Sequence, residues 1–269
     1  LQYLSLDAIL EHPVSLSTTQ ITGTAGGYLD PLEGTLILTA LRTLIALPIG
    51  VSTAVWLSEY GRPAGLARAV ESGVEIVAGT PTIVLAIFGL LVFTQGAFGF
   101  LSFTAEGGAV FGRSFFIAGI MMSLIAIPLI VGATREALQS IPAHVREASY
   151  ALGKDKISTI RRVLLPAARK GIATGTTLGM GRIAGDTAIV ILLLGGTSTL
   201  EPEGGTPILS TLKGTGSTLT SYVYNNSPAG EGHAPEKAYA VAFVLLIIVI
   251  LMNFFVDLIS RKGSDPWAR

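Results

Sequence analysis

The chain has 269 residues, of which half are apolar and only 13% are charged, and its mean hydropathy is +0.62. A soluble domain carries about 25% charged residues, so this composition indicates a membrane protein. The formal net charge is zero and cysteine is absent, which argues against a nucleic-acid partner, disulfides, thiol chemistry and a cysteine-ligated metal site.

Long apolar segments dominate the chain after residue 33. Residues 1–33 contain acidic side chains and lack the basic start and apolar core of a signal peptide, so we expect an external segment there. Five later segments are long enough to cross a bilayer, which takes about 20 residues. They are residues 34–57, 71–94, 114–136, 169–194 and 237–259. We therefore expect an all-α, polytopic transmembrane bundle that forms a single domain over residues 1–269, with five spans visible.

Basic residues are distributed unevenly between the segments that connect these spans. With residues 137–168 placed in the cytoplasm, most lysines and arginines fall on the cytoplasmic side, as the positive-inside rule requires. Residue 1 then lies outside, and we expect a sixth helix before it. The external loop, residues 195–236, is too long for a plain connection. It either docks an external binding protein or is a tether, and a short surface or re-entrant helix is predicted around Ile208, Leu209, Leu212 and Leu219.

The segment before Pro166 combines helix signals with a turn signal. Pro142 suits the first turn of a helix, and good helix formers follow it. Gly153 can adopt the left-handed conformation that ends a helix. A second helix is predicted from about Lys156 to Leu165, ending before Pro166. Four residues of the first helix and its end either dock in a partner's hydrophobic groove or belong to an ordinary basic cytoplasmic loop. They are Ala148, Tyr150, Ala151 and Leu152.

The same segment carries a spaced motif, in which Glu147-Ala148-Ser149 is followed by Gly153 and then by Val163-x-Leu165-Pro166. This arrangement resembles the EAA loop of bacterial ABC-importer permeases, with Ser149 and Val163 in place of the family's Ala and Ile. The resemblance implies that two ATPase subunits dock on this loop. The coupling residues that it implies are Glu147, Ala148, Ser149, Gly153, Leu165 and Pro166.

Two further segments resemble the PstA-type permease of the phosphate-specific ABC importer. One is A-L-P-I-G at 46–50 with S-E-Y-G at 58–61, and the other is R-I-A-G-D-T-A at 182–188. The resemblance implies a multi-pass permease for inorganic phosphate in the bacterial inner membrane, paired with a second homologous permease and supplied by a periplasmic phosphate-binding protein. It also implies that this chain is no enzyme and holds no cofactor, because ATP and Mg are bound by the ATPase subunits.

Charged side chains inside a span are costly and usually functional. Arg182 and Asp186 are four residues apart, so one continuous helix would place them on a common face. The resemblance assigns this arginine and this acid, with the adjoining Thr187, to phosphate movement, and a guanidinium matches the oxygens of phosphate. The alternative is a structural ion pair facing the partner permease. Arg42 in the first span either snorkels to the surface or lines the outer part of the pathway.

Gly171, Gly175 and Gly179 recur at a spacing that lets two helices approach closely. This surface packs either on a second permease subunit or on another helix of the same chain.

Three alternative functions remain open. The first is a permease for another oxyanion or a small organic solute. A membrane-embedded lipid enzyme would need clustered His, Asp or Ser residues at the membrane surface, and none is evident. A passive channel is disfavoured by the docking loop.

Overall fold

The structure is a computed structural model that describes residues 28–102, 112–183, 186–194, 211–228, 230 and 234–261. Its regular elements, in chain order, are α2 (Leu29–Val55), the π-helix η3 (Trp56–Tyr60), α3 (Ala64–Gly79), α4 (Thr82–Phe93), the 3-10 helix η4 (Gly96–Leu101), α5 (Phe115–Gln139), α6 (Ala143–Ala151), α7 (Lys156–Thr159), the π-helix η6 (Ile160–Leu164), α8 (Leu165–Ile183), α9 (Thr187–Ile189), the π-helix η7 (Val190–Leu194), α11 (Leu219–Asn226) and α12 (Pro235–Arg261). The predicted all-α class is confirmed over the described residues.

Three helices in the described part of the chain are long and apolar enough to cross a membrane. They are Leu29–Tyr60, which joins α2 to η3, Phe115–Gln139 of α5, and Pro235–Leu258 of α12. These helices correspond to the first, third and fifth predicted spans. Pro48 lies inside α2 without dividing it.

The predicted second span, residues 71–94, is divided into two helices. α3 ends at Gly79 and α4 begins at Thr82, with Pro81 as the cap between them (φ −59°, ψ 136°). A proline has no N–H to donate to the preceding turn and disfavours helical backbone in the residue before it. The two helices form a fourth candidate span only if they are treated as one bent pair.

The predicted fourth span, residues 169–194, is not among these candidates, and the expectation of one continuous helix there is wrong. α8 ends at Ile183, and Asp186 has an extended backbone (φ −82°, ψ 101°) before α9 begins at Thr187. α8 also contains several basic residues and glycines, which lower its hydropathy.

Two compact units are built from interleaved segments of the chain. The first comprises Leu1–Arg42, Thr80–Ser123 and Ile183–Ile250, and the second comprises Thr43–Gly79, Leu124–Arg182 and Leu251–Arg269. The long helices α2, α5 and α12 contribute residues to both units.

Hydrogen bonds between segments far apart in sequence close the first unit. The N–H of Ser114, just before α5, donates to the carbonyl oxygen of Leu193 in η7 at 3.1 Å. The N–H of Leu219, the first residue of α11, donates to the hydroxyl oxygen of Thr35 in α2 at 2.9 Å. These bonds join the start of α5 to η7 and the start of α11 to α2 within this unit.

A short helix is present in the predicted external loop. α11 begins at Leu219, and Thr218 caps it in a reciprocal arrangement with Ser221. This confirms a helix at Leu219, whereas Ile208 and Leu209 lie outside the described residues. The loop therefore carries regular structure of its own close to the first unit's core.

Close packing of α8 on α5 shapes the second unit. A Cβ added at Gly171 would lie 2.2 Å from the Cβ of Ala137, and one at Gly175 would lie 3.0 Å from the Cβ of Ala133. Gly179 likewise faces α5. Glycines let the two backbones approach to a distance that any side chain would prevent. The glycine stripe thus packs within the chain, and not on a second permease subunit.

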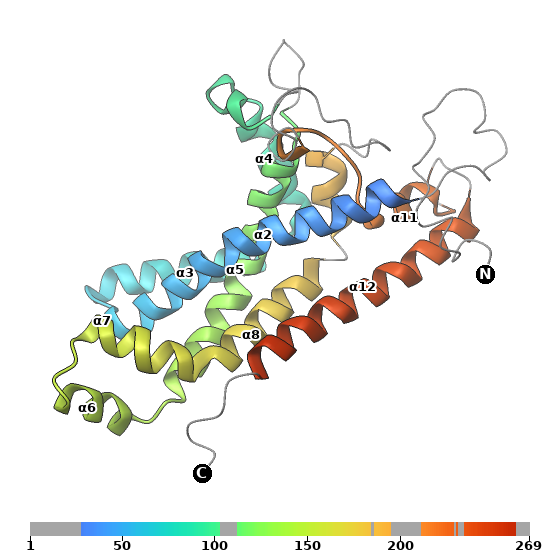
Figure 1. Cartoon of the computed structure of the whole chain (residues 1–269). Coiled ribbons are helices and arrows are strands. Elements are labelled where there is room, and N and C mark those ends of the chain that lie inside the picture. The colour runs from blue at the N-terminus through green and yellow to red at the C-terminus, as the bar shows by residue number, and fades with distance from the viewer. Residues whose placement is uncertain are drawn as a thin grey trace. The chain divides into compact units, whose positions relative to one another are not determined.

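Figure 1 shows α7 running on into α8, with α6 beside it at the end of this unit. The predicted helix end before Pro166 is wrong, because η6 leads directly into α8 at Leu165. Pro166 is exposed in the first turn of α8, and Leu165 is half-buried. The N–H of Leu165 donates to the carbonyl of Ile160 in a π-type bond. A proline at the start of the following α-turn is tolerated because it breaks no needed bond there.

Candidate functional site

The turn between α6 and α7 has the geometry that its sequence predicts. Gly153 has a φ of +77°, in the left-handed region. Its N–H donates to the carbonyl of Tyr150 at 2.9 Å, and the N–H of Lys154 donates to the carbonyl of Ser149 at 3.3 Å. These two bonds form a Schellman-type helix end, which normally requires glycine at the left-handed position. The predicted role of Gly153 in the backbone is confirmed.

One face of this helix-turn-helix is buried in the second unit. The hydroxyls of Ser149 in α6 and Thr159 in α7 share a hydrogen bond of 2.8 Å, and both residues are buried. They lie beside an apolar cluster formed by Leu138, Ile141, Val145, Ile160, Leu164 and Ala168. Ser149, predicted as a coupling residue, is therefore buried and joins α6 to α7.

The opposite face is exposed and partly apolar. Glu147 and Ala148 are exposed on α6. Tyr150 and Ile157 are also exposed, and Leu152, just before the turn, is 78% exposed. Apolar side chains on a short, rigid helical element are suited to a complementary groove on another protein.

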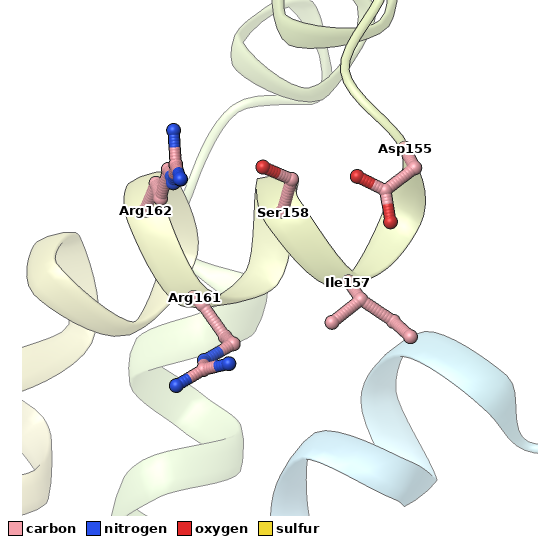
Figure 2. A pocket seen from close by; sticks show the side chains of 5 residues that line it. All are labelled: Asp155, Ile157, Ser158, Arg161 and Arg162. Atoms are coloured by element: carbon pink, nitrogen blue, oxygen red, sulfur yellow. The ribbon is translucent and has the colours of Figure 1, made fainter.

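A surface hollow lies beside this exposed face. Its volume is about 520 Å³, and it is lined by residues of α7, its cap and η6, namely Asp155, Ile157, Ser158, Arg161 and Arg162. Figure 2 shows the two arginine side chains pointing in different directions from the helix. All lining residues come from one short stretch, so the hollow is an open, cationic surface feature.

Sequence analysis assigns no individual role to Glu59, which lies at the end of the first span. Its carboxylate accepts hydrogen bonds from Arg146 of α6, at 3.1 Å from Nε and 3.0 Å from Nη2. Only 7% of the Glu59 side chain is exposed. The signal in the sequence was an acid at the end of a span, two residues before Gly61, but its partner is 87 residues away.

Arg42 is buried in the first unit, with only 2% of the residue exposed. Its guanidinium lies within electrostatic range of the carboxylate of Asp186, which belongs to the same unit. The interpretation that Arg42 snorkels to the surface is therefore wrong. A buried arginine is stabilised by an opposite charge, and Asp186 provides one.

Asp186 and Arg182 do not share one helical face. Asp186 precedes α9, and its side chain accepts a hydrogen bond from the N–H of Ile189 at 3.4 Å. Thr187 is the half-buried first residue of α9. The backbone of Arg182 belongs to the last turn of α8, and its side chain lies outside the described part of the structure. An acid at a helix start satisfies free N–H groups, which explains why the chain breaks here.

The sequence of this chain is similar to those of known membrane components of transport systems. A family model described as "Binding-protein-dependent transport system inner membrane component" matches residues 46–264. The phosphate transport system permease protein PstA 1 of Mycobacterium tuberculosis is 32% identical over 231 residues, covering 85% of this chain and 69% of that protein. A probable phosphate transport system permease protein PstA of Methanocaldococcus jannaschii is 33% identical over 242 residues, covering 86% and 76%. A PstC protein of Xylella fastidiosa is 29% identical over 248 residues, covering 87% and 72%.

Solved structures share the fold. A chain of the MetNI methionine ABC transporter in inward-facing conformations superposes with a TM-score of 0.61 at 24% identity, covering 88% of this chain and 94% of that chain. A chain of a bacterial alginate ABC transporter, in complex with an alginate-bound periplasmic protein, gives 0.62 at 18% identity, covering 92% and 83%. The arrangement of helices is thus that of an ABC-transporter membrane subunit.

Proposed function

Because this chain belongs to the family of binding-protein-dependent transport system inner membrane components, we propose that it is the permease subunit of an ATP-driven importer for inorganic phosphate. The names of its relatives support phosphate as the substrate. The observation that carries the import mechanism is the helix-turn-helix of α6 and α7. Its buried face is fully packed, while Tyr150, Leu152 and Ile157 remain exposed.

In this proposal two ATPase subunits bind the α6–α7 segment. They hold ATP and Mg and perform the hydrolysis, so this chain itself needs no cofactor. Glu147 and Ala148 lie on the exposed face and contact the partner directly. Gly153 and Ser149 fix the shape of the segment, and Pro166 marks where the segment joins α8.

The substrate pathway in this proposal passes the charged residues Arg42 and Asp186 of the first unit. Arg42 comes from α2, and Asp186 and Thr187 come from the start of α9. Arg182, at the end of α8, is four residues before Asp186 in the chain. A guanidinium presents several donors to a phosphate, and the nearby carboxylate can hold it until the anion arrives. Transport then exchanges the electrostatic interaction between Arg42 and Asp186 for an arginine–phosphate pair.

A second, homologous permease completes the pathway, and a periplasmic phosphate-binding protein delivers the solute to the external side. Residues 137–168 face the cytoplasm and residues 195–236 face outward in this arrangement. The helix α11 in the outer loop is anchored by its bond to Thr35, and Tyr28 lies 6.3 Å from Tyr222 between ring centroids. A firmly held outer surface suits transient docking of a binding protein.

The deciding experiment is uptake by the reconstituted complex in proteoliposomes. The chain is purified with its paired permease and ATPase subunits, and radiolabelled phosphate uptake is measured with ATP inside and the binding protein outside. We expect saturable, ATP-dependent phosphate uptake that excess sulfate does not inhibit. ATP-dependent uptake of another oxyanion or of a small organic solute, without phosphate uptake, would refute phosphate as the substrate.

A further inference from the structure

The first span ends in a widened turn that differs from the rest of the helix. Trp56–Tyr60 is a π-helix, and the N–H of Gly61 donates to the carbonyl of Trp56 at 2.8 Å. Gly61 then takes a left-handed conformation with a φ of +38°. A π-turn adds a residue to the helix and changes the direction of the side chains that follow, and such turns are frequent at functional sites. Here the turn carries the carboxylate of Glu59, which lies in the second unit.

Arg146 joins this turn to two other helices. Besides its bonds to the Glu59 carboxylate, its Nη1 donates to the carbonyl of Ile141 and its Nη2 donates to the carbonyl of Leu138, each at 2.8 Å. Leu138 lies in the last turn of α5, and Arg146 itself belongs to α6. One guanidinium therefore connects the ends of α2 and α5 to the first helix of the α6–α7 segment.

Lys156 joins the same turn to the second helix of that segment. Its ammonium group donates to the backbone carbonyl of Glu59 and lies 4.2 Å from the ring centroid of Tyr60. Lys156 is the first residue of α7. Both helices of the segment thus contact one residue, Glu59, through its side chain and through its backbone.

We propose that Glu59 is a positioning residue that transmits movement of the α6–α7 segment to α2, so that the first span moves with the segment. This inference rests on the proposed function, in which ATPase subunits move that segment. The two charge-assisted bonds from the Arg146 guanidinium to the Glu59 carboxylate are stronger than bonds between neutral groups, so they tie α6 to the end of the first span. α2 continues from this turn as one helix and carries Arg42.

A second ion pair in the same unit provides a matched control. Arg135 of α5 and Glu71 of α3 lie 2.5 Å apart, but their side chains are 37% and 32% exposed. This pair joins α5 to α3, and solvent screens a pair of this kind. Glu71→Gln therefore removes a carboxylate of the same type without touching the proposed connection.

The test uses the whole reconstituted complex. Two quantities are measured for each variant: phosphate imported per ATP hydrolysed, and ATP-induced fluorescence change of a label on Ser52→Cys. Ser52 is exposed on α2, and the chain has no other cysteine. We expect Glu59→Gln to lower the import ratio about tenfold, within the range for loss of coupling through such networks. We also expect it to abolish the fluorescence change while the ATPase subunits still copurify.

Each outcome decides for or against the inference. Normal coupling in the assembled Glu59→Gln complex overturns it, as does an equal loss in Glu71→Gln. If Glu59→Gln does not assemble, Lys156→Met removes the α7 contact without leaving a carboxylate unpaired, and normal coupling in that variant overturns the inference. A third outcome separates the two proposals. The wild-type complex would import no phosphate but would show the ATP-induced fluorescence change, and Glu59→Gln would lose that change. The positioning role of Glu59 would then stand, and phosphate would be refuted as the substrate.

Discussion

The α6–α7 segment and the break between α8 and α9 differ in what determines their structure. In the α6–α7 segment, Pro142 caps the first helix and Gly153 ends it, as the sequence predicts. At the break, the sequence predicts one helix, but Asp186 has an extended backbone and caps the next helix. The first region follows from local backbone chemistry. The second carries a charge, Asp186, that lies within electrostatic range of Arg42, a residue distant in sequence and buried in the same unit.

This comparison shows how a charge inside a membrane protein changes local structure. Apolar periodicity favours continuing the helix through residues 169–194, but a carboxylate in an apolar surrounding needs donors and an opposite charge. Breaking the helix at Asp186 supplies both, since the N–H of Ile189 becomes available and Arg42 lies within electrostatic range. Local signals are therefore reliable where polar groups are satisfied within a few residues, and less so where the partner belongs to another helix.

The largest effect is expected from removing the acidic partner charge of Arg42 in the first unit. Asp186→Asn removes a negative charge within electrostatic range of a buried arginine, so we expect loss of both phosphate uptake and assembly. In the double variant Arg42→Gln/Asp186→Asn neither charge remains, and we expect assembly to recover while uptake stays lost. Phosphate uptake by the purified double variant is the measurement.

The control for this pair is Glu75→Gln, which removes an exposed carboxylate of α3 and should leave uptake unchanged. Near-normal uptake by the assembled double variant would assign Arg42 and Asp186 a purely structural role. The break between α8 and α9 would then matter only for folding, and other residues would have to line the phosphate pathway.

A large effect on stability is expected at the contact between α8 and α5. Gly171→Ala places a methyl group 2.2 Å from the Cβ of Ala137, so the helices must separate, at a cost of about 1–3 kcal/mol. Gly132→Ala is the matched control, because no atom lies within 4 Å of a Cβ at that helical position. The control should be neutral or stabilising by about 0.5–1 kcal/mol. Thermal unfolding in detergent measures both, and equal midpoints would show that α8 does not pack this closely.

Much of the architecture could be predicted because it follows from composition and local pattern. The all-α class, three of the spans and the turn at Gly153 require only apolar length and the backbone freedom of glycine. Likewise, Ser149 is part of a spaced motif that marks the coupling segment. The motif does not show that its hydroxyl is buried against Thr159, because the spacing of residues contains no information on which face packs inward.

The features that could not be predicted depend on contacts between helices, which a single sequence does not reveal. Glu59 contacts Arg146 across 87 residues, so no local pattern links them. The glycine stripe at 171–179 predicts a close helix contact, but the identity of the facing helix required the structure. At Pro166 the predicted helix end fails because the preceding π-turn rearranges the hydrogen bonds that a proline would otherwise disrupt.

A smaller effect is expected from the turn itself. Gly153→Val forces a β-branched residue into left-handed backbone, which costs about 1–2 kcal/mol. No atom lies within 4 Å of a Cβ there, so the cost is one of backbone conformation and not of packing. We expect weaker copurification of the ATPase subunits with normal membrane insertion. Gly153→Asn is the matched control, since asparagine tolerates this conformation better and should lose less. Equal copurification by both variants would contradict a role for the left-handed turn.

The smallest effect is expected from the hydrogen bond between Ser149 and Thr159. Thr159→Val keeps the shape of a fully buried side chain but leaves the Ser149 hydroxyl without this partner, at a cost of about 1 kcal/mol or slightly more. The double variant Ser149→Ala/Thr159→Val removes both hydroxyls and should recover part of that loss, because no buried polar group is then stranded. Thermal unfolding of the two single variants and the double variant gives the coupling energy directly. Additive losses would show that the two hydroxyls do not interact. A clear recovery would instead show that this part of the motif holds α6 to α7. Contact with the partner would then be made by the exposed residues around it.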